Sequence, residues 1–116
     1  MYRERHLERR ETSAHWPARQ DVSGTVVGLV ADMSTEGIGI HSEHGFTKGQ
    51  QLALRVSVDE RLCGQDHLCL TVENVWCQRH AASGLYHAGC KIVELSRQAR
   101  VCIERLMMEF SYPVSG

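Results

Sequence analysis

The chain of 116 residues carries a formal net charge of -1, and 42% of its residues are hydrophobic, which is ordinary for one soluble globular domain. Because the chain as a whole is nearly neutral, it is not a general binder of polyanions, and recognition of phosphate would need a local cluster of positive charge. No apolar run reaches the length of a membrane span, and the N-terminus lacks the hydrophobic segment of a secretory signal. We therefore expect a cytoplasmic protein without membrane insertion.

The first 15 residues are polar, rich in arginine and without strand periodicity. Arg5, Arg9 and Arg10 lie here, whereas the whole chain has only two lysines. A guanidinium group is a planar fork of hydrogen-bond donors that matches phosphates and purine edges. We expect residues 1–15 to form an arginine-rich arm and residues 16–112 to form the folded domain.

From Trp16 onward, short runs with β character alternate with turns. The expected strands share alternating or β-branched apolar residues, and beyond the run that starts at Trp16 they cover 25–33, 38–41, 51–58, 68–76 and 86–92. The alternation shifts phase near Glu73 and Asn74, which predicts a β-bulge. We expect Trp76 to lie in the core and Tyr86 to pack its ring while its hydroxyl reaches outward.

A C-terminal helix is predicted after the strands. Ser96 is a good N-cap residue, and apolar residues recur at helical spacing at Ala99, Ile103, Leu106 and Phe110. Short strands at this spacing, followed by one helix, indicate an all-β fold: a small barrel or sandwich that the helix closes at one end.

The five cysteines lack the dense, regular spacing of a secreted disulfide scaffold. A group in the second half could suggest zinc; its members are Cys63, His67, Cys69, Cys77 and His80. Their spacing does not form the usual paired knuckles, so we expect no metal site. We interpret the cysteines as small hydrophobic residues, with Cys90 and Cys102 buried.

Two short motifs occur in order along the chain. Residues 5–9 read R-x-x-x-R, with Arg10 as an alternative second arginine, and residues 32–37 read D-x-S-x-x-G directly after an apolar strand. Alone, the first also fits a helix face with ion pairs and the second fits an ordinary turn. Together on this β pattern they resemble the signature of the PilZ domain family. Weaker family-like features follow at Gly49, Val75-Trp76 and 84–89.

The resemblance implies a six-stranded antiparallel β-barrel with a C-terminal α-helix, in a bacterial receptor for the second messenger cyclic di-GMP. It implies that the ligand-binding residues are Arg5, Arg9, Arg10, Asp32, Ser34 and Gly37. It also implies relay of the signal to a protein partner. The chain contains no G-x-S-x-G elbow, P-loop or H-E-x-x-H motif, so we predict no enzyme activity, and we expect no binding of DNA.

The chemistry of these residue types fits this ligand. The acceptors O6 and N7 of guanine match an arginine fork, and its N1–H and N2–H₂ donors match the carboxylate of Asp32. Ser34 can add a hydroxyl contact, and Gly37 allows either a positive φ or close approach of backbone to ligand. Two alternatives stay open: a protein-interaction module of the same fold that does not bind nucleotide, and a small zinc- or RNA-binding barrel.

Overall fold

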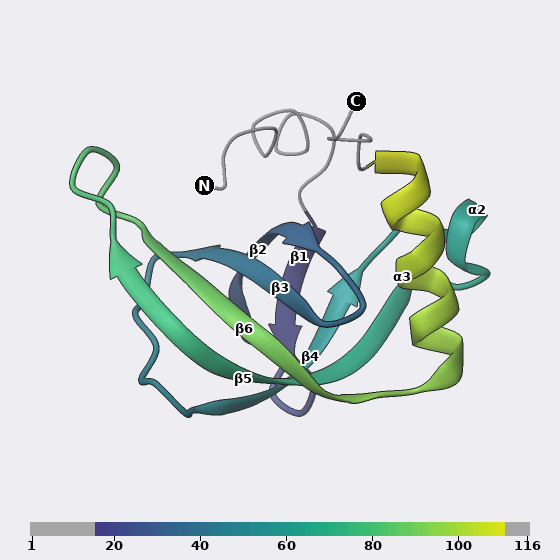
Figure 1. The fold of residues 1–116 in the computed structure, drawn as a ribbon, viewed down its shortest axis with the longest axis horizontal. Coiled ribbons are helices and arrows are strands. Elements are labelled where there is room, and N and C mark those ends of the chain that lie inside the picture. Colours follow the sequence, from purple (N-terminus) through teal and green to yellow (C-terminus); the bar gives the residue numbers. More distant parts are fainter. Residues whose placement is uncertain (1–15, 111–116) are drawn as a thin grey trace.

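The structure, a computed structural model, describes residues 16–110 as a closed barrel with two helices (Figure 1). The strands are β1 (Trp16–Gln20), β2 (Val26–Met33), β3 (Gly37–Ser42), β4 (Gln51–Ser57), β5 (His67–Arg79) and β6 (Tyr86–Leu95). They close in the order β1-β2-β3-β6-β5-β4, and every neighbouring pair is antiparallel. The predicted six-stranded antiparallel barrel with a C-terminal helix is therefore confirmed.

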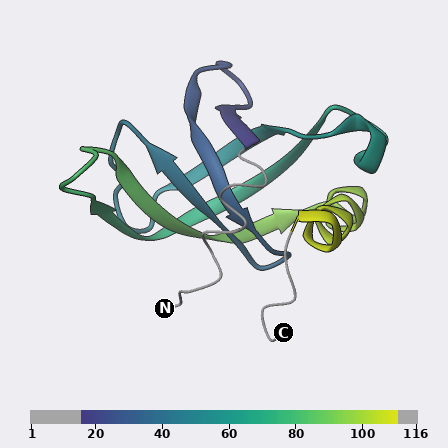
Figure 2. The ribbon, with the colours of Figure 1, turned by 90° about the horizontal axis from the view of Figure 1, so that it is seen from above.

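The two helices lie together at one end of the barrel (Figures 1 and 2). Helix α3 (Arg97–Phe110) starts where the sequence predicts, because the Ala99 amide donates a 3.0 Å hydrogen bond to the Ser96 hydroxyl. Helix α2 (Glu60–Cys63) is a single turn that ends at Gly64, whose φ of 78° lies in the left-handed region. A run of four residues carries no helical periodicity, so the sequence did not predict α2. Neither helix in the described part of the chain is long and apolar enough to cross a bilayer.

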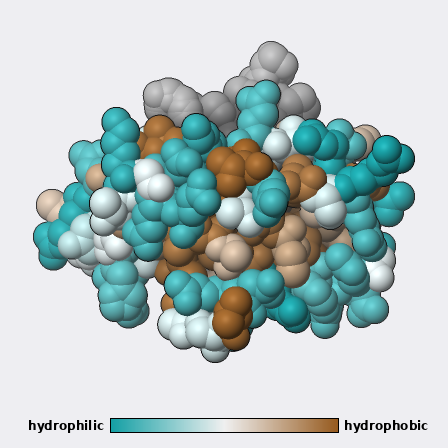
Figure 3. All heavy atoms as spheres, turned by 90° about the horizontal axis from the view of Figure 1, so that it is seen from below, coloured by the Kyte–Doolittle hydropathy of each residue, from teal (hydrophilic) through white to brown (hydrophobic). Residues whose placement is uncertain are grey.

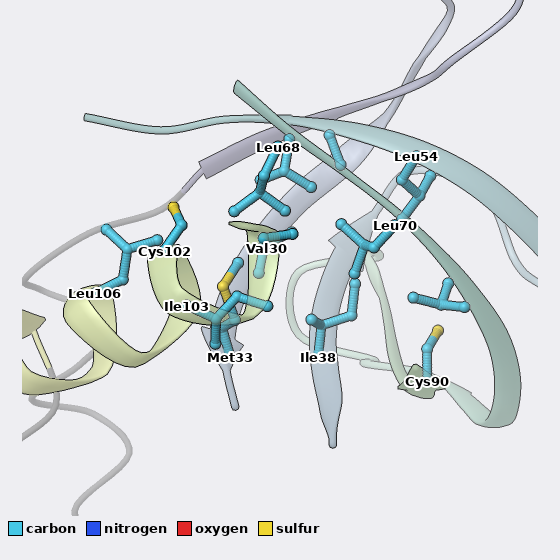
Figure 4. Packing of buried hydrophobic residues seen from close by; sticks show 14 of the residues in the cluster. Val30, Met33, Ile38, Leu54, Leu68, Leu70, Cys90, Cys102, Ile103 and Leu106 are labelled. Atoms are coloured by element: carbon cyan, nitrogen blue, oxygen red, sulfur yellow. The ribbon is translucent and has the colours of Figure 1, made fainter. Parts of the chain in front are cut away.

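The core lies between the barrel wall and α3 (Figure 4). Alternate residues of the strands point inward, as in β4, where Leu54 and Val56 are fully buried. Helix α3 covers the open end with Ile103 and Leu106, both almost completely buried. Burying each aliphatic side chain of this size stabilises the fold by roughly 1.5–3 kcal/mol, so α3 is an integral part of the domain.

A β-bulge interrupts the pairing of β5 with β6, as the phase shift predicted. Asn74 is opposite Cys90 and Trp76 is opposite Gly89, so β5 contains one more residue than β6 across this interval. The extra residue ends the strict alternation, and Trp76 leaves the inner face with 51% of its surface exposed. The prediction that Trp76 lies in the core is therefore wrong. Tyr86 is partly buried and its ring packs close to Gly45.

The cysteines divide into a linked pair and three free thiols. Cys63 and Cys102 form a disulfide between α2 and α3, with their Cα atoms 4.8 Å apart. The sequence did not predict this bond, because the two cysteines are 39 residues apart and only the packing of α2 against α3 brings them together. Cys90 and Cys102 are buried as predicted, whereas Cys69 is exposed. Within residues 16–110, no group of three or more His, Cys, Asp or Glu side chains is arranged to hold a metal ion.

Candidate functional site

A groove of about 1020 Å³ runs across the outer face of β2, β3, β6 and β5. The strand register sets a row of four residues along it. Asp32 is opposite Gly39, Gly39 is opposite Gly89, and Gly89 is opposite Trp76. Residues that are opposite one another on antiparallel strands share a face of the sheet, so the row forms the middle of the groove.

The two central residues of the row are glycines, which leave the floor of the groove without side chains. A Cβ on Gly39 would lie 2.8 Å from Oδ2 of Asp32. A Cβ on Gly89 would collide with the indole of Trp76 at Nε1. The carboxylate and the indole therefore lean inward over the floor from its two ends, and each occupies space that only glycine leaves open.

One side of the groove carries a column of imidazole rings. His41 is opposite His87, and their ring centroids are 4.0 Å apart with an interplanar angle of 12°. His80 continues the stack on the other side of His87, at 4.9 Å. His41 and His87 line the groove together with Gln78. No local sequence pattern selects these rings, because they come from three separate strands or strand ends and meet only in the folded sheet.

The other side of the groove carries charged residues and the D-x-S-x-x-G turn. Lys91 lines the groove, and its Nζ lies 3.8 Å from a carboxylate oxygen of Glu73. The Ser34 hydroxyl accepts hydrogen bonds from the amides of Glu36 and Gly37, at 3.1 and 3.2 Å. Ser34 thus shapes the turn that follows Asp32.

Gly37 is glycine because two strands approach closely at this point. Its φ is not among the positive values found in the barrel, and a Cβ would lie 2.6 Å from the carbonyl oxygen of Cys90 on β6. Of the two reasons the sequence allowed for this glycine, the positive φ is therefore wrong. The close approach that the structure contains is to a neighbouring strand.

Cys90 contributes to the groove wall without being a reactive thiol. Burial raises the pKa of the Cys90 thiol, and a hydrogen bond with Asn74 only partly opposes this shift. A thiol with a raised pKa is protonated at neutral pH and is a poor nucleophile. Cys90 is therefore a protonated, unreactive member of the groove wall.

The predicted ligand-binding residues divide into two groups. Asp32, Ser34 and Gly37 lie together at one end of the groove. Arg5, Arg9 and Arg10 are outside the described residues. The sequence did not identify Trp76, His87 or Gly89 as part of the site. For the last two a signal existed: the H-x-G pattern at 87–89 places His87 and Gly89 on one face of β6.

An antiparallel barrel with one closing helix and a glycine-floored groove on its exterior defines a small β-barrel domain with a candidate ligand site. The sequence matches the model of the PilZ domain over residues 4–109, which is most of the chain. The chain belongs to the PilZ domain family.

Solved structures of the same fold include two proteins of low sequence identity. The inhibitor of motility MotI/DgrA of Bacillus subtilis superposes with a TM-score of 0.69 at 13% identity, over 84% of this chain and 46% of that chain. The PilZ domain of YcgR from Escherichia coli, solved with c-di-GMP, gives a TM-score of 0.60 at 9% identity, over 83% of this chain and 80% of that chain. The chain thus spans about half the length of MotI/DgrA. No curated protein matches the sequence.

Proposed function

We propose that this chain is a receptor for cyclic di-GMP and that the nucleotide binds in the exterior groove. PilZ domains are regulatory binding domains, so a binding function fits the family better than catalysis. One observation carries the proposal: Asp32 and Trp76 lean over a glycine floor from its two ends. A volume of about 1020 Å³ is at the upper end of the range of small-molecule sites, so it offers room for a dinucleotide.

Each part of the groove offers a contact for one part of this ligand. The Asp32 carboxylate can accept from N1–H and N2–H₂ of a guanine, a donor pair that adenine lacks. The exposed face of Trp76 can stack on a base, since every base has a π-face. The Lys91 ammonium gives a positive charge for a phosphate, and Arg5 with Arg9 or Arg10 would supply the forks for phosphate and for guanine O6 and N7.

The signal would reach a protein partner through the arm of residues 1–15. In this proposal the arm closes over the groove when the ligand binds and thereby creates or hides a partner surface. On one face of the molecule, hydrophobic side chains lie exposed among hydrophilic ones (Figure 3). A surface of this kind is suited to contact with another protein.

The test is a calorimetric titration of the unmutated chain with cyclic di-GMP and with cyclic di-AMP. We expect binding of cyclic di-GMP and clearly weaker binding of cyclic di-AMP. Asp32→Ala should lower the affinity for cyclic di-GMP at least about tenfold, because a bidentate contact to a base contributes roughly 1–3 kcal/mol. Asp21→Ala is the matched control, since Asp21 pairs with Arg55 outside the groove.

Two results would contradict the proposal. The first is equal affinity of the unmutated chain for both nucleotides, which would show that no carboxylate reads the guanine edge. The second is that neither titration releases or absorbs heat and that a high concentration of either nucleotide leaves the midpoint of thermal unfolding unchanged. That second result would favour the interaction module that does not bind nucleotide.

A further inference from the structure

Asn74 is a buried polar residue beside the groove, at the β-bulge of β5. Only 1% of its surface is exposed. Within residues 16–110, Asn74 and Ser42 are the only buried polar residues. Its backbone is engaged toward the segment before β4: the Asn74 amide donates to the Gln50 carbonyl and the Gly49 amide donates to the Asn74 carbonyl, both at 2.8 Å. These backbone bonds leave the side chain to make its own hydrogen bonds at the bulge.

The side-chain amide of Asn74 bonds the two residues that form the aromatic end of the groove. Its Nδ2 donates to the carbonyl of Trp76 at 2.9 Å and to the carbonyl of Gly89 at 3.3 Å. Trp76 and Gly89 are opposite one another directly after the bulge. One side chain thus ties together the backbones of both strands at the point where the regular ladder is interrupted.

The bulge decides which way Trp76 points. With strict alternation, a residue two positions after the buried Asn74 would also face inward. Instead, Val75 and Trp76 are both on the outside, with 42% and 51% of their surfaces exposed. The indole can lie over Gly89 only because the strand contains this extra residue.

The second polar atom of the Asn74 side chain makes an amide at this position energetically unfavourable. Its Oδ1 is buried and has no hydrogen-bonding partner among the described residues. A buried unpaired oxygen destabilises a fold, and an apolar residue of similar size would avoid that cost. The bonds that Nδ2 donates to the carbonyls of Trp76 and Gly89, with a longer contact to Cys90 Sγ, offset it.

We propose that Asn74 is a positioning residue for the ligand site, which holds the bulge and thereby directs Trp76 over Gly89 into the groove. This inference rests on the proposed function, because it assumes that the ligand stacks on Trp76. Asn74 itself does not contact the ligand. Its effect on affinity passes through the tryptophan.

A double-mutant cycle tests this dependence. Trp76→Ala and Asn74→Ala should each weaken binding of cyclic di-GMP about tenfold, as expected for one base-stacking contact. The double variant should bind no more weakly than Trp76→Ala alone, because Asn74 has nothing to position once the indole is gone. Losses that multiply to about a hundredfold would overturn the proposal, since they would show that the two residues act independently.

A second measurement needs no ligand. The chain has two tryptophans, so in a Trp16→Phe background the fluorescence reports Trp76 alone. Asn74→Ala should change its emission maximum and its quenching by acrylamide. Ser42→Ala is the matched control, because it also removes the hydrogen bonds of a buried polar side chain. The Ser42 hydroxyl donates to the Val27 carbonyl at 2.7 Å and accepts from the His44 amide at 3.0 Å, and its loss should leave the Trp76 signal unchanged.

The two measurements separate the proposals from each other. If the unmutated chain does not bind cyclic di-GMP, the proposed function fails, and the fluorescence still decides whether Asn74 positions Trp76. A folded Asn74→Ala protein with an unchanged Trp76 signal refutes the inference. If Asn74→Ala does not fold, Asn74→Ser keeps one donor and should show a smaller change. Failure of both variants to fold would mean that Asn74 supports the barrel as a whole, and that outcome also overturns the inference.

Discussion

Gly39 and Gly89 shape the groove because neither residue has a side chain. Neither has a positive φ, so the backbone at both positions is one that other residues adopt. Their role is steric: a Cβ at Gly39 would contact the Asp32 carboxylate, and a Cβ at Gly89 would displace the Trp76 indole. The two ends of the groove can therefore be altered separately by one added methyl group each.

Gly89→Ala should weaken binding of cyclic di-GMP about tenfold by moving the indole off the floor, because stacking on an aromatic residue contributes roughly 1–3 kcal/mol per base. The preference over cyclic di-AMP should remain, since Asp32 is untouched. Gly39→Ala should instead reduce that preference. Calorimetric titration of both variants with both nucleotides checks the prediction, with Val93→Ala on β6 outside the groove as the control. Loss of guanine preference in Gly89→Ala would show that the two ends of the groove are not independent.

At the scale of strands and helices, local sequence patterns predicted the strands and α3, but neither the single-turn helix α2 nor the long-range contacts. Alternation predicted the strands and even the bulge in β5, and the cap at Ser96 predicted the start of α3. Trp76 emerges on the outside at the bulge, where Asn74 bonds to Trp76 on β5 and to Gly89 on β6, and no local pattern contains this pairing of the two strands. The same holds for the Cys63–Cys102 disulfide, which depends on the packing of α2 against α3.

For the candidate site too, the sequence predicted the residues of a local motif but not those that meet through long-range pairing. Asp32, Ser34 and Gly37 are consecutive members of one motif, so the sequence could place them together. His41, His87 and Trp76 come from three strands, and only the barrel register brings them to the same groove. Long-range pairing of this kind determines most of the groove wall.

The cap of α3 allows a test of stability that is separate from binding. Ser96→Ala removes the acceptor for the Ala99 amide and should lower the free energy of unfolding by about 1 kcal/mol. For a domain of this size such a loss lowers the thermal midpoint by roughly 4–8 °C. Ser96→Asp, which keeps a capping oxygen, should restore most of the stability. Thermal unfolding measures both variants.

Affinity for cyclic di-GMP should stay unchanged in Ser96→Ala, because α3 does not line the groove. A loss of affinity equal to that of Asp32→Ala would contradict this separation and would make α3 part of the binding site.

At the scale of the whole molecule, the groove and the arginine arm belong to one binding device in the proposed function. The PilZ match begins at residue 4 and so includes Arg5, Arg9 and Arg10, although the described structure starts at Trp16. Four arginines within residues 1–10 repel one another, and Glu4 and Glu8 only partly offset that repulsion. A dianionic ligand in the groove would supply the missing negative charge.

Binding should therefore change the susceptibility of the arm to protease. Trypsin should cleave after Arg5, Arg9 or Arg10 quickly in the free protein and much more slowly at saturating cyclic di-GMP, because closure of the arm over the groove removes these sites from the protease. Ordering the arm opposes binding by roughly 1–2 kcal/mol for each residue fixed, so protection requires strong contacts from the arginines. Mass spectrometry of the early fragments gives the two rates. Asp32→Ala at the same nucleotide concentration is the control, and it should be protected less than the unmutated protein, because its lower affinity leaves a larger fraction of the chains without ligand. Equal rates for the unmutated chain with and without ligand would show that the arm does not close over the groove, even if calorimetry confirms binding.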